Sequence, residues 1–344
     1  MTALGRRKQP VSSPGAVFFL YGIVHTMEHK PVLVSGIKPT GDLHIGNYFG
    51  AMRQQVELAK SGKYQPYIFI ADYHALNTMQ DAGEMRRRTR ELLMAYLAAG
   101  LDPKEATLFK QSDVPAHTEL AWIFDTITTV PYLMRAHAFK DAEAKSKEIS
   151  AGTFTYPMLM AADILLYDAA VVPVGADQKQ HIEYARDAAE KFNRVYRTEL
   201  FKLPEPYIMP EVAVVPGTDG QKMSKSYGNV IPLFGTKDAL AEAVMSIVTD
   251  SSGERPQNVY AIHALVKSEA ELTPLYEANK GNYKMLKEAL IADLDAYFAP
   301  MRARYEELAQ NTDSVDTVLK EGGAKAREVS EAKMLQVRKA IGVA

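Results

Sequence analysis

Apolar stretches alternate with helical spacing through the first half of the chain. Apolar residues dominate positions 31–34, 67–72, 106–110 and 170–174, as expected for parallel strands that are covered on both faces. Between these stretches apolar residues recur every three or four positions, which is typical of the buried face of a helix. The alternation predicts an α/β fold with a doubly wound parallel sheet.

The pattern changes after Asn229, where helical spacing continues with little strand signal. Pro300 is expected to kink or split one of these helices, because proline removes a backbone donor. The sequence predicts two domains: residues 31–228, with the sheet and a helical stretch at 117–150, and an all-helical domain at 229–344 whose last helix can pack back on the first. The helical segments expected in the second domain are 236–249, 258–267, 269–278, 281–309, 313–320 and 323–341.

Residues 1–30 precede this pattern and are expected to be a disordered or mis-annotated leader. A charged segment followed by an apolar one gives them the outline of a signal peptide, but no small-residue cleavage site follows. No run approaches the roughly 20 apolar residues that span a bilayer, so no membrane partner is expected. The absence of cysteine excludes disulfides and thiolate metal sites. A net charge of −2 weighs slightly against an RNA partner, which would have to meet a local basic patch.

Residues 35–47, SGIKPTGDLHIGN, connect the first predicted strand to the first predicted helix. A glycine-containing turn at this position directs free backbone N–H groups above the sheet edge, where they suit phosphate. Gly46 and Gly50 lie one turn apart on the helix. Each costs about 0.5–1 kcal/mol relative to alanine, which suggests close approach by backbone or ligand. The alternative is a strand–turn–helix unit that binds nothing.

Residues 219–226, DGQKMSKS, form a loop with two lysines three positions apart and two small hydroxyl side chains. Such a loop can fold over an anion and bring both ammonium groups to it. Taken alone, a lysine-rich loop is more often a solvated surface, and the arginine row at 86–90 is interpreted in that way.

Polar residues follow two of the predicted strands, at 72–77 (DYHALN) and at 175–178 (GADQ). Open α/β sheets bind their ligands at the carboxyl ends of the strands. Asp177 could accept hydrogen bonds from both hydroxyls of a ribose, or it could simply cap the helix that follows.

Asp163 is the single carboxylate of the apolar helix predicted at 155–167. A buried carboxylate without a partner would be costly. Met160, Tyr167 and Tyr156 fall on the same helical face, which suggests an aromatic slot closed by one acceptor. The alternative is a helix in which Asp163 faces solvent or caps a neighbouring element.

Two of these stretches carry recognisable signatures. The segment His44–Asn47 resembles the HIGH signature, with Asn47 in place of the final His, and Lys222–Ser226 is the complete KMSKS signature of class I aminoacyl-tRNA synthetases. The resemblance extends from Val32 to the C-terminus and points to the bacterial-type tryptophanyl-tRNA synthetases. The related tyrosyl enzymes usually have Gln where Met160 stands. Other stretches that support it are IADYHALN, ATLFKQSDVPAH, TYPMLMAADILLYDAAVVPVGADQKQHIE and EGGAKAREVSEAKMLQVRKAIG.

The resemblance implies a Rossmann-like catalytic domain and a helical anticodon-binding domain in a cytoplasmic homodimer. It implies activation of L-tryptophan with ATP and Mg²⁺ to tryptophanyl-adenylate and pyrophosphate, and transfer of tryptophan to tRNA(Trp). No protein ligand to a metal is expected.

The residue roles that the resemblance implies are as follows. The catalytic residues would be Lys222, Lys225, Lys140 and His44. The ATP-binding residues would be Lys38, Pro39, Thr40, Gly46, Asn47, Gly175, Ala176, Asp177, Val215, Lys222, Met223, Ser224, Lys225 and Ser226. The tryptophan-binding residues would be Asp163, Tyr156, Met160, Gln178 and His74. Basic candidates for contact with tRNA are Lys284, Lys287, Arg302, Arg304, Lys325 and Arg327.

The chemical requirements of amino-acid activation are consistent with these residues, independently of the family resemblance. A carboxylate is already a nucleophile toward the α-phosphorus of ATP, so in-line positioning and neutralisation of the leaving pyrophosphate suffice. Three alternatives stay open from the residues: a tyrosyl-tRNA synthetase, a small-molecule nucleotidyltransferase of the same superfamily, and an inactive paralogue that binds without catalysing.

Overall fold

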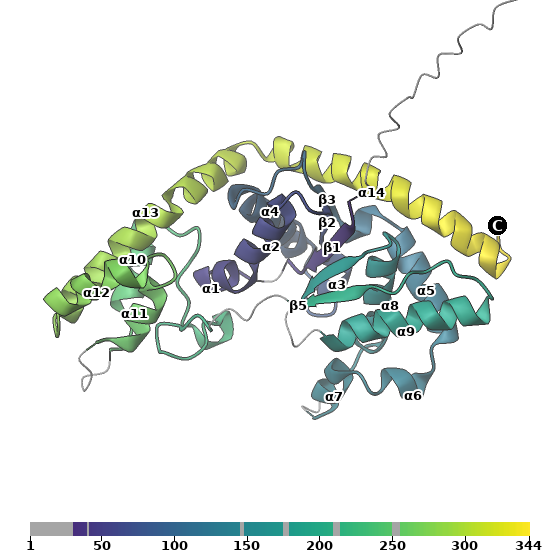
Figure 1. The fold of residues 1–344 in the computed structure, drawn as a ribbon, viewed down its shortest axis with the longest axis horizontal. Helices are drawn as coiled ribbons and strands as arrows, with labels where there is room; N and C mark the ends of the chain where they lie inside the picture. The colour runs from purple at the N-terminus through teal and green to yellow at the C-terminus, as the bar shows by residue number, and fades with distance from the viewer. Residues whose placement is uncertain (1–29, 40, 145–147, 175–178, 209–213, 250–254) are drawn as a thin grey trace, which may run out of the picture.

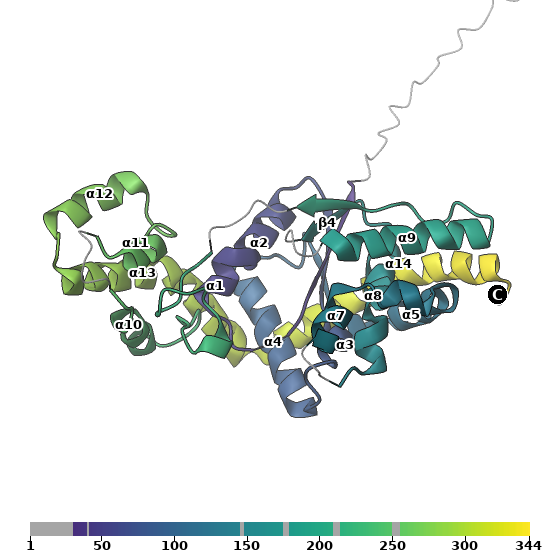
Figure 2. The same ribbon diagram turned by 90° about the horizontal axis from the view of Figure 1, so that it is seen from below.

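The computed structural model describes residues 30–39, 41–144, 148–174, 179–208, 214–249 and 255–344. The expected leader therefore lies outside the described residues, apart from residue 30. Figures 1 and 2 show an elongated molecule with the sheet near its middle and the helices α10 to α13 gathered at one end.

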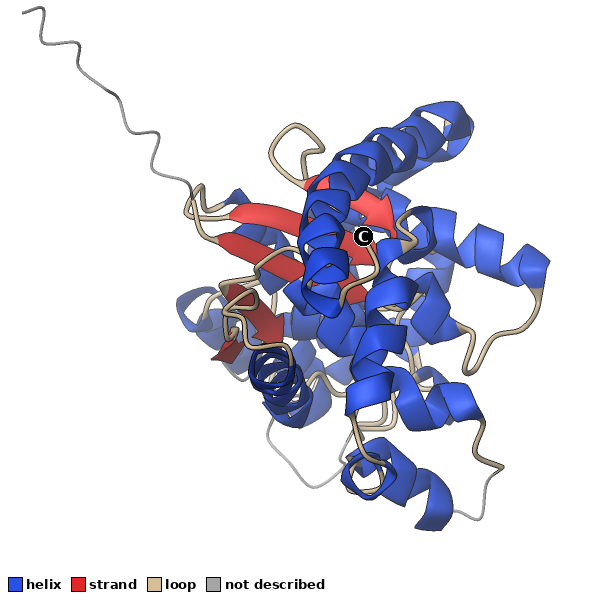
Figure 3. Cartoon of the chain, turned by 90° about the vertical axis from the view of Figure 1, so that its right-hand side faces the viewer, coloured by secondary structure: helices blue, strands red, loops and turns tan. Residues whose placement is uncertain are grey.

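Five parallel strands form a single sheet in the order β3-β2-β1-β4-β5. The predicted doubly wound sheet is confirmed, and helices cover both of its faces (Figure 3). Because β1 pairs with β2 on one side and β4 on the other, the winding reverses at β1, which is where such sheets bind ligands. The strands are β1 (Val32–Ile37), β2 (Gln65–Ile70), β3 (Thr107–Lys110), β4 (Val171–Val174) and β5 (Glu205–Ile208).

The strand β5 was not predicted from the sequence. It has only four residues and contains Pro206, which has no backbone donor. Proline is tolerated there because β5 lies at the edge of the sheet.

A single helical stretch follows the first strand, consisting of α1 (Ile45–Asn47), a π-helical turn (Tyr48–Met52) and α2 (Arg53–Lys60). In the helical stretch predicted at 117–150, the described residues up to 144 lie mainly in three separate helices, α5 to α7. The helices of the sheet region beyond α2 are α3 (Asp72–Ala75), α4 (Ala82–Ala98), α5 (Ala116–Ile127), α6 (Val130–Leu133), α7 (His137–Ala144), α8 (Ala151–Leu165) and α9 (Lys179–Val195).

The C-terminal helices are more continuous than expected. The helix α13 runs through Pro300, so the expected split there is wrong, and the segments 313–320 and 323–341 are one helix, α14. The helices there are α10 (Lys237–Met245), α11 (Gln257–His263), α12 (Glu269–Ala278), α13 (Tyr283–Gln310) and α14 (Thr312–Ile341).

The paired glycines inside α14 have a packing role. A Cβ atom at Gly322 would lie 1.8 Å from the carbonyl oxygen of Leu108 in β3, so only glycine lets the helix approach this strand. The helix α14 thereby covers an edge strand, whose unpaired backbone groups would otherwise be exposed (Figure 1). Ion pairs from Arg338 to Glu119 and from Lys333 to Asp168 hold the rest of the helix against the sheet region.

The helices of the C-terminal region share an apolar core with the first βα unit. Phe49 is fully buried, and its ring centroid lies 5.7 Å from that of Phe298 in α13. The same cluster contains Met223 from the loop at 219–226. Folding of the first βα unit, the lysine loop and α13 is therefore coupled through one core. None of the helices in the described ranges is long and apolar enough to cross a bilayer.

Candidate active site

The two signature segments lie against each other. Met223, between the two lysines of the loop, is only 4% exposed, and its Cβ atom lies 3.2 Å from where a Cβ at Gly46 would be. Gly46 therefore permits the close approach that was predicted for it. At Gly50 a Cβ would meet no heavy atom of the described residues within 4 Å, so close packing of the protein does not explain this glycine.

Asn229 fixes the conformation of the lysine loop. Its side-chain amide donates to Asp219 Oδ1 at 2.7 Å and to the carbonyl of Lys222 at 3.2 Å, and its oxygen accepts from the backbone N–H of Ser224 at 2.8 Å. Because Asn229 is buried, these bonds are shielded from water. The sequence pattern does not identify Asn229, because its partners lie before and within the signature while Asn229 lies after it.

The lysine side chains of the loop remain at the surface. Lys222 is exposed, and Lys225 is 54% exposed with its Nζ 3.0 Å from Oδ2 of Asp42, which lies in the turn before the first signature. Ser224 and Ser226 share a hydrogen bond of 2.9 Å between their hydroxyls. Because these ammonium groups are exposed and only weakly paired, they can bind an anionic ligand with little free-energy penalty.

The other predicted ATP-binding residues fall into three groups. Pro39 is buried after β1, while Lys38 is exposed and partial desolvation lowers the pKa of its ammonium group. Val215 is buried and accepts the backbone N–H of Met223 at 2.9 Å. Thr40, Gly175, Ala176 and Asp177 lie outside the described residues.

His44 and Asn47 are joined within the first signature. The backbone N–H of His44 donates to Asn47 Oδ1 at 3.0 Å. Burial lowers the pKa of His44, so its imidazole is neutral at pH 7. Lys140 is exposed on α7, and no interaction among the described residues connects it with the lysine loop. The predicted catalytic set is therefore brought together only in part.

Asp163 is the centre of a buried polar network. It is 2% exposed. Its Oδ2 lies 2.9 Å from His74 Nε2, and its Oδ1 lies 2.7 Å from Gln111 Nε2 and 2.6 Å from His117 Nδ1. The alternative in which Asp163 faces solvent is wrong. A carboxylate offers about four acceptor positions, so one is left for a ligand.

The hydrogen bonds keep Asp163 ionised. Burial raises the pKa of its carboxyl group, but the hydrogen bonds from His117 and His74 outweigh this effect and lower it to about 2. The Nδ1–H of His117 donates to the ionised Asp163, and its Nε2 shares a hydrogen bond of 2.9 Å with the hydroxyl of Tyr167, which orients the imidazole ring.

The aromatic slot predicted around Asp163 differs in its composition. Tyr167 is buried behind His117 and stacks on Tyr67 at 4.9 Å, so it supports the network and does not line a slot. Tyr156 and Met160 are partly buried, and the hydroxyl of Tyr156 is hydrogen-bonded to the ring of His181. Gln178 lies outside the described residues.

Three further residues at this site were missed or misread. Gln111 and His117 follow β3 at the carboxyl edge of the sheet, which is the signal that could have found them. Arg88 belongs to the arginine row that was interpreted as solvated. This interpretation is wrong for Arg88, whose side chain is 7% exposed and ion-paired with Asp42.

The comparisons with known proteins agree with this geometry. The model of the family "tRNA synthetases class I (W and Y)" matches residues 26–320. The chain is 48% identical over 318 residues to the tryptophan--tRNA ligase of Fusobacterium nucleatum, with 90% of this chain and 97% of the relative covered. It is 44% identical over 320 residues to the tryptophan--tRNA ligase of Rhodopirellula baltica, with 90% and 99% covered.

A solved structure shows the same relationship. The tryptophanyl-tRNA synthetase of Campylobacter jejuni complexed with ADP and tryptophan matches with a TM-score of 0.84 and 41% identity, covering 90% of this chain and 99% of that chain. The chain therefore belongs to the class I tRNA synthetases and, within them, to the family of tryptophan--tRNA ligases. The resemblance stated from the two signatures is confirmed.

Proposed function

We propose that this chain activates L-tryptophan with ATP and transfers it to tRNA(Trp). In the first step a carboxylate oxygen of tryptophan attacks the α-phosphorus, the bond to the β-phosphate breaks, and pyrophosphate leaves. In the second step a ribose hydroxyl at the end of the tRNA attacks the carbonyl carbon, and AMP leaves. The observation that carries this proposal is a buried ionised acceptor, Asp163, in the same fold as an exposed lysine loop packed on the first signature.

The nucleotide side works through charge and position. Lys222 and Lys225 neutralise the charge that grows on the pyrophosphate, and His44 with the backbone at Gly46 and Asn47 holds the phosphates above β1. Lys140, exposed on α7, is the third cation proposed for the phosphates. Gly175, Ala176 and Asp177 hold the adenosine. Mg²⁺ would be carried by the phosphates of ATP, since it prefers to keep waters and phosphate ligands. Among the described residues no group of side chains that could hold a metal ion is found.

The tryptophan side works through a fixed acceptor. The remaining lone pair of Asp163 accepts the indole N–H, and indole has no acceptor to repel the carboxylate. Met160 packs on the indole ring, and Tyr156 with Gln178 holds the amino group. His74 keeps Asp163 in place from one side, while His117 and Gln111 do so from the other.

The proposal includes tRNA(Trp) as a partner of the helical region 229–344, in the cytoplasm. Lys287 is removed from the candidate contacts, because it is buried and donates to the carbonyls of Met245 and Ile247. Lys284 is an exposed candidate there. We also propose a homodimer, supported by exposed apolar side chains on and next to α5 and α6: Trp122 at 69%, Val130 at 59% and Met134 at 44%.

Amino-acid-dependent exchange of pyrophosphate into ATP tests the activity across all twenty amino acids. We expect tryptophan to support the fastest exchange. Exchange with tyrosine that equals or exceeds that with tryptophan would support a tyrosyl enzyme, and exchange with no amino acid would contradict the proposal. Binding of tRNA(Trp) should weaken as salt rises, because each neutralised phosphate releases counterions. An affinity that does not change between low and physiological salt would argue against the RNA partner.

A further inference from the structure

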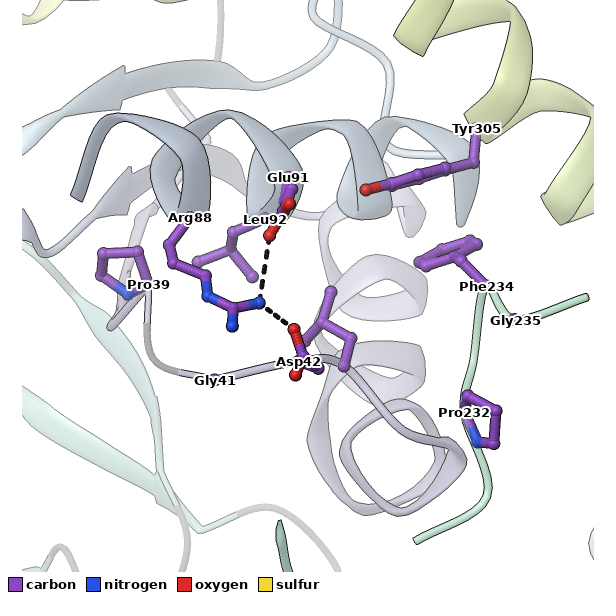
Figure 4. Close-up of a pocket in the computed structure, with 11 residues that line it drawn as sticks. Pro39, Gly41, Asp42, Arg88, Glu91, Leu92, Pro232, Phe234, Gly235 and Tyr305 are labelled. Atoms are coloured by element: carbon purple, nitrogen blue, oxygen red, sulfur yellow. Dashed lines mark hydrogen bonds and ion pairs between the residues drawn. The ribbon is translucent and has the colours of Figure 1, made fainter. Parts of the chain in front are cut away.

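Three charged side chains from distant segments meet beside the first signature. Asp42 lies in the turn before α1, Arg88 on α4, and Lys225 in the second signature. The carboxylate of Asp42 pairs with Arg88 through one oxygen and with Lys225 Nζ at 3.0 Å through the other. Figure 4 shows Arg88 reaching from α4 toward both Asp42 and Glu91, at a cavity of about 250 Å³.

The two cations of this trio differ in their freedom. The Arg88 side chain is 7% exposed, and it is also held by Glu91 at 3.2 Å and Glu84 at 3.5 Å. Lys225 is 54% exposed, and Asp42 is its ion-pair partner in the described part of the chain. Arg88 is therefore an anchor, and Lys225 is the member that can leave.

The backbone beside Asp42 is shaped for this contact. Gly41 has φ = +73°, and a Cβ atom there would lie 3.4 Å from Lys225 Cδ. The stem of the lysine thus passes over Gly41 to reach Asp42. The carboxylate is fully ionised, because the hydrogen bond from Arg88 and then that from Lys225 lower the pKa of Asp42 to about 2.

We infer that Asp42 is a positioning residue that holds Lys225 in the ligand-free protein and competes with the phosphates of ATP for its ammonium group. Arg88 limits this hold, because it shares the charge of Asp42. The inference rests on the proposed function of Lys225 as a phosphate-binding lysine. By this inference Asp42 affects the affinity for ATP, although it is neither of the two lysines of the second signature.

The sign of each substitution follows from the competition. Asp42→Asn removes the carboxylate that competes with phosphate for Lys225, so the Kd for ATP should fall about two- to fivefold, the range expected for an exposed ion pair. Arg88→Gln leaves Asp42 without its anchor and tightens its hold on Lys225, so the Kd should rise by a similar factor. Tryptophan affinity should not change in either variant.

Equilibrium dialysis with labelled ATP measures these affinities independently of catalysis. Asp316→Asn is the matched control. It breaks the exposed ion pair between Asp316 and Arg90, which lies on α4 like Arg88, and it should leave ATP affinity unchanged. In a Lys225→Ala background Asp42→Asn should lose its effect. If Arg88→Gln fails to fold, this double-mutant cycle still decides.

The inference is overturned if Asp42→Asn weakens ATP binding or leaves it unchanged. It is also overturned if Asp42→Asn acts equally with and without Lys225, since Asp42 would then only shape the turn. Tryptophan-dependent exchange by the unmodified protein is measured alongside. Its absence would count against the proposed function, whereas the dialysis results bear on Asp42 alone.

Discussion

The two sides of the proposed site are built in opposite ways. Asp163 is 2% exposed and accepts hydrogen bonds from three side chains on two other segments of the fold. Lys225 is 54% exposed and pairs with Asp42, which is itself 68% exposed. A buried network of this kind is assembled when the chain folds, and each missing bond is costly. An exposed pair adds little to stability and can be exchanged for a substrate. Under the proposed function, the difference predicts that the acceptor for tryptophan is fixed in advance, whereas the phosphate-binding cations are positioned by the ligand.

The largest effect is expected from removing the buried acceptor. Asp163→Ala should lower the free energy of unfolding by about 3–5 kcal/mol, as does breaking a buried ionic pair, because His74, Gln111 and His117 lose their acceptor. The Michaelis constant for tryptophan should rise about tenfold to a hundredfold, as expected for the loss of a hydrogen bond to a charged group, while that for ATP stays nearly intact. Chemical denaturation and pyrophosphate exchange measure the two effects. Asp163→Asn, which keeps the shape and one acceptor oxygen, is the control. If Asp163→Ala retained its affinity for tryptophan, Asp163 would not be the acceptor of the indole N–H.

Substitution of the exposed Lys225 should affect the rate of adenylation strongly and the stability of the fold only slightly. Lys225→Ala should slow single-turnover adenylation by at least about a hundredfold, since one lost donor to a developing charge costs about 2.7–4 kcal/mol in the barrier. Its stability should change by no more than about 0.5 kcal/mol, as for other surface substitutions. Rapid-quench kinetics and thermal unfolding test both parts. Adenylation at the unmodified rate would remove Lys225 from the mechanism.

What the sequence could predict follows the same division. Both lysines and the first signature are local patterns, and the continuous apolar stretches were sufficient for four of the five strands. The partners of Asp163 are 46, 52 and 89 residues away in the chain, so no local pattern contains them. Arg88 was misread for the same reason, because the carboxylate that draws it into the interior is 46 residues earlier. The strand β5 was missed because it is short and contains proline.

Discrimination against tyrosine tests how completely the tryptophan side is pre-formed. A rigid pocket filled by indole leaves a void around phenol, worth about 1–3 kcal/mol per small group. Tyrosine should therefore support exchange about tenfold to a few hundredfold less well than tryptophan. Met160→Gln is the informative variant, because it replaces a side chain that packs on rings with one that can hydrogen-bond a hydroxyl. Equal exchange with both amino acids would mean that the fixed network does not determine the substrate.

The smallest predicted difference concerns acid stability. The pKa of Asp163 is about 2 in the folded protein, below the ordinary value of 3.8 for aspartate. Its ionised form therefore stabilises the fold above about pH 4, and this contribution, on the order of 2 kcal/mol, is lost as the pH falls toward 2. The pKa of Asp42 is also about 2, but this carboxylate is exposed. Because solvent screens its ion pairs, the lowered pKa contributes little to the free energy of unfolding.

Urea unfolding at several pH values between 7 and 2.5 separates the two carboxylates. The stability gap between the unmodified protein and Asp163→Asn should narrow as the pH falls, because only the unmodified protein must protonate a buried carboxylate. The gap for Asp42→Asn should be small at every pH and should vanish in high salt, which screens exposed pairs but not buried ones. The stability difference between the unmodified protein and Asp42→Asn could instead shrink on acidification as steeply as that for Asp163→Asn. Both sides of the site would then be equally fixed before substrate binds, and Lys225 would not need to be repositioned by ATP.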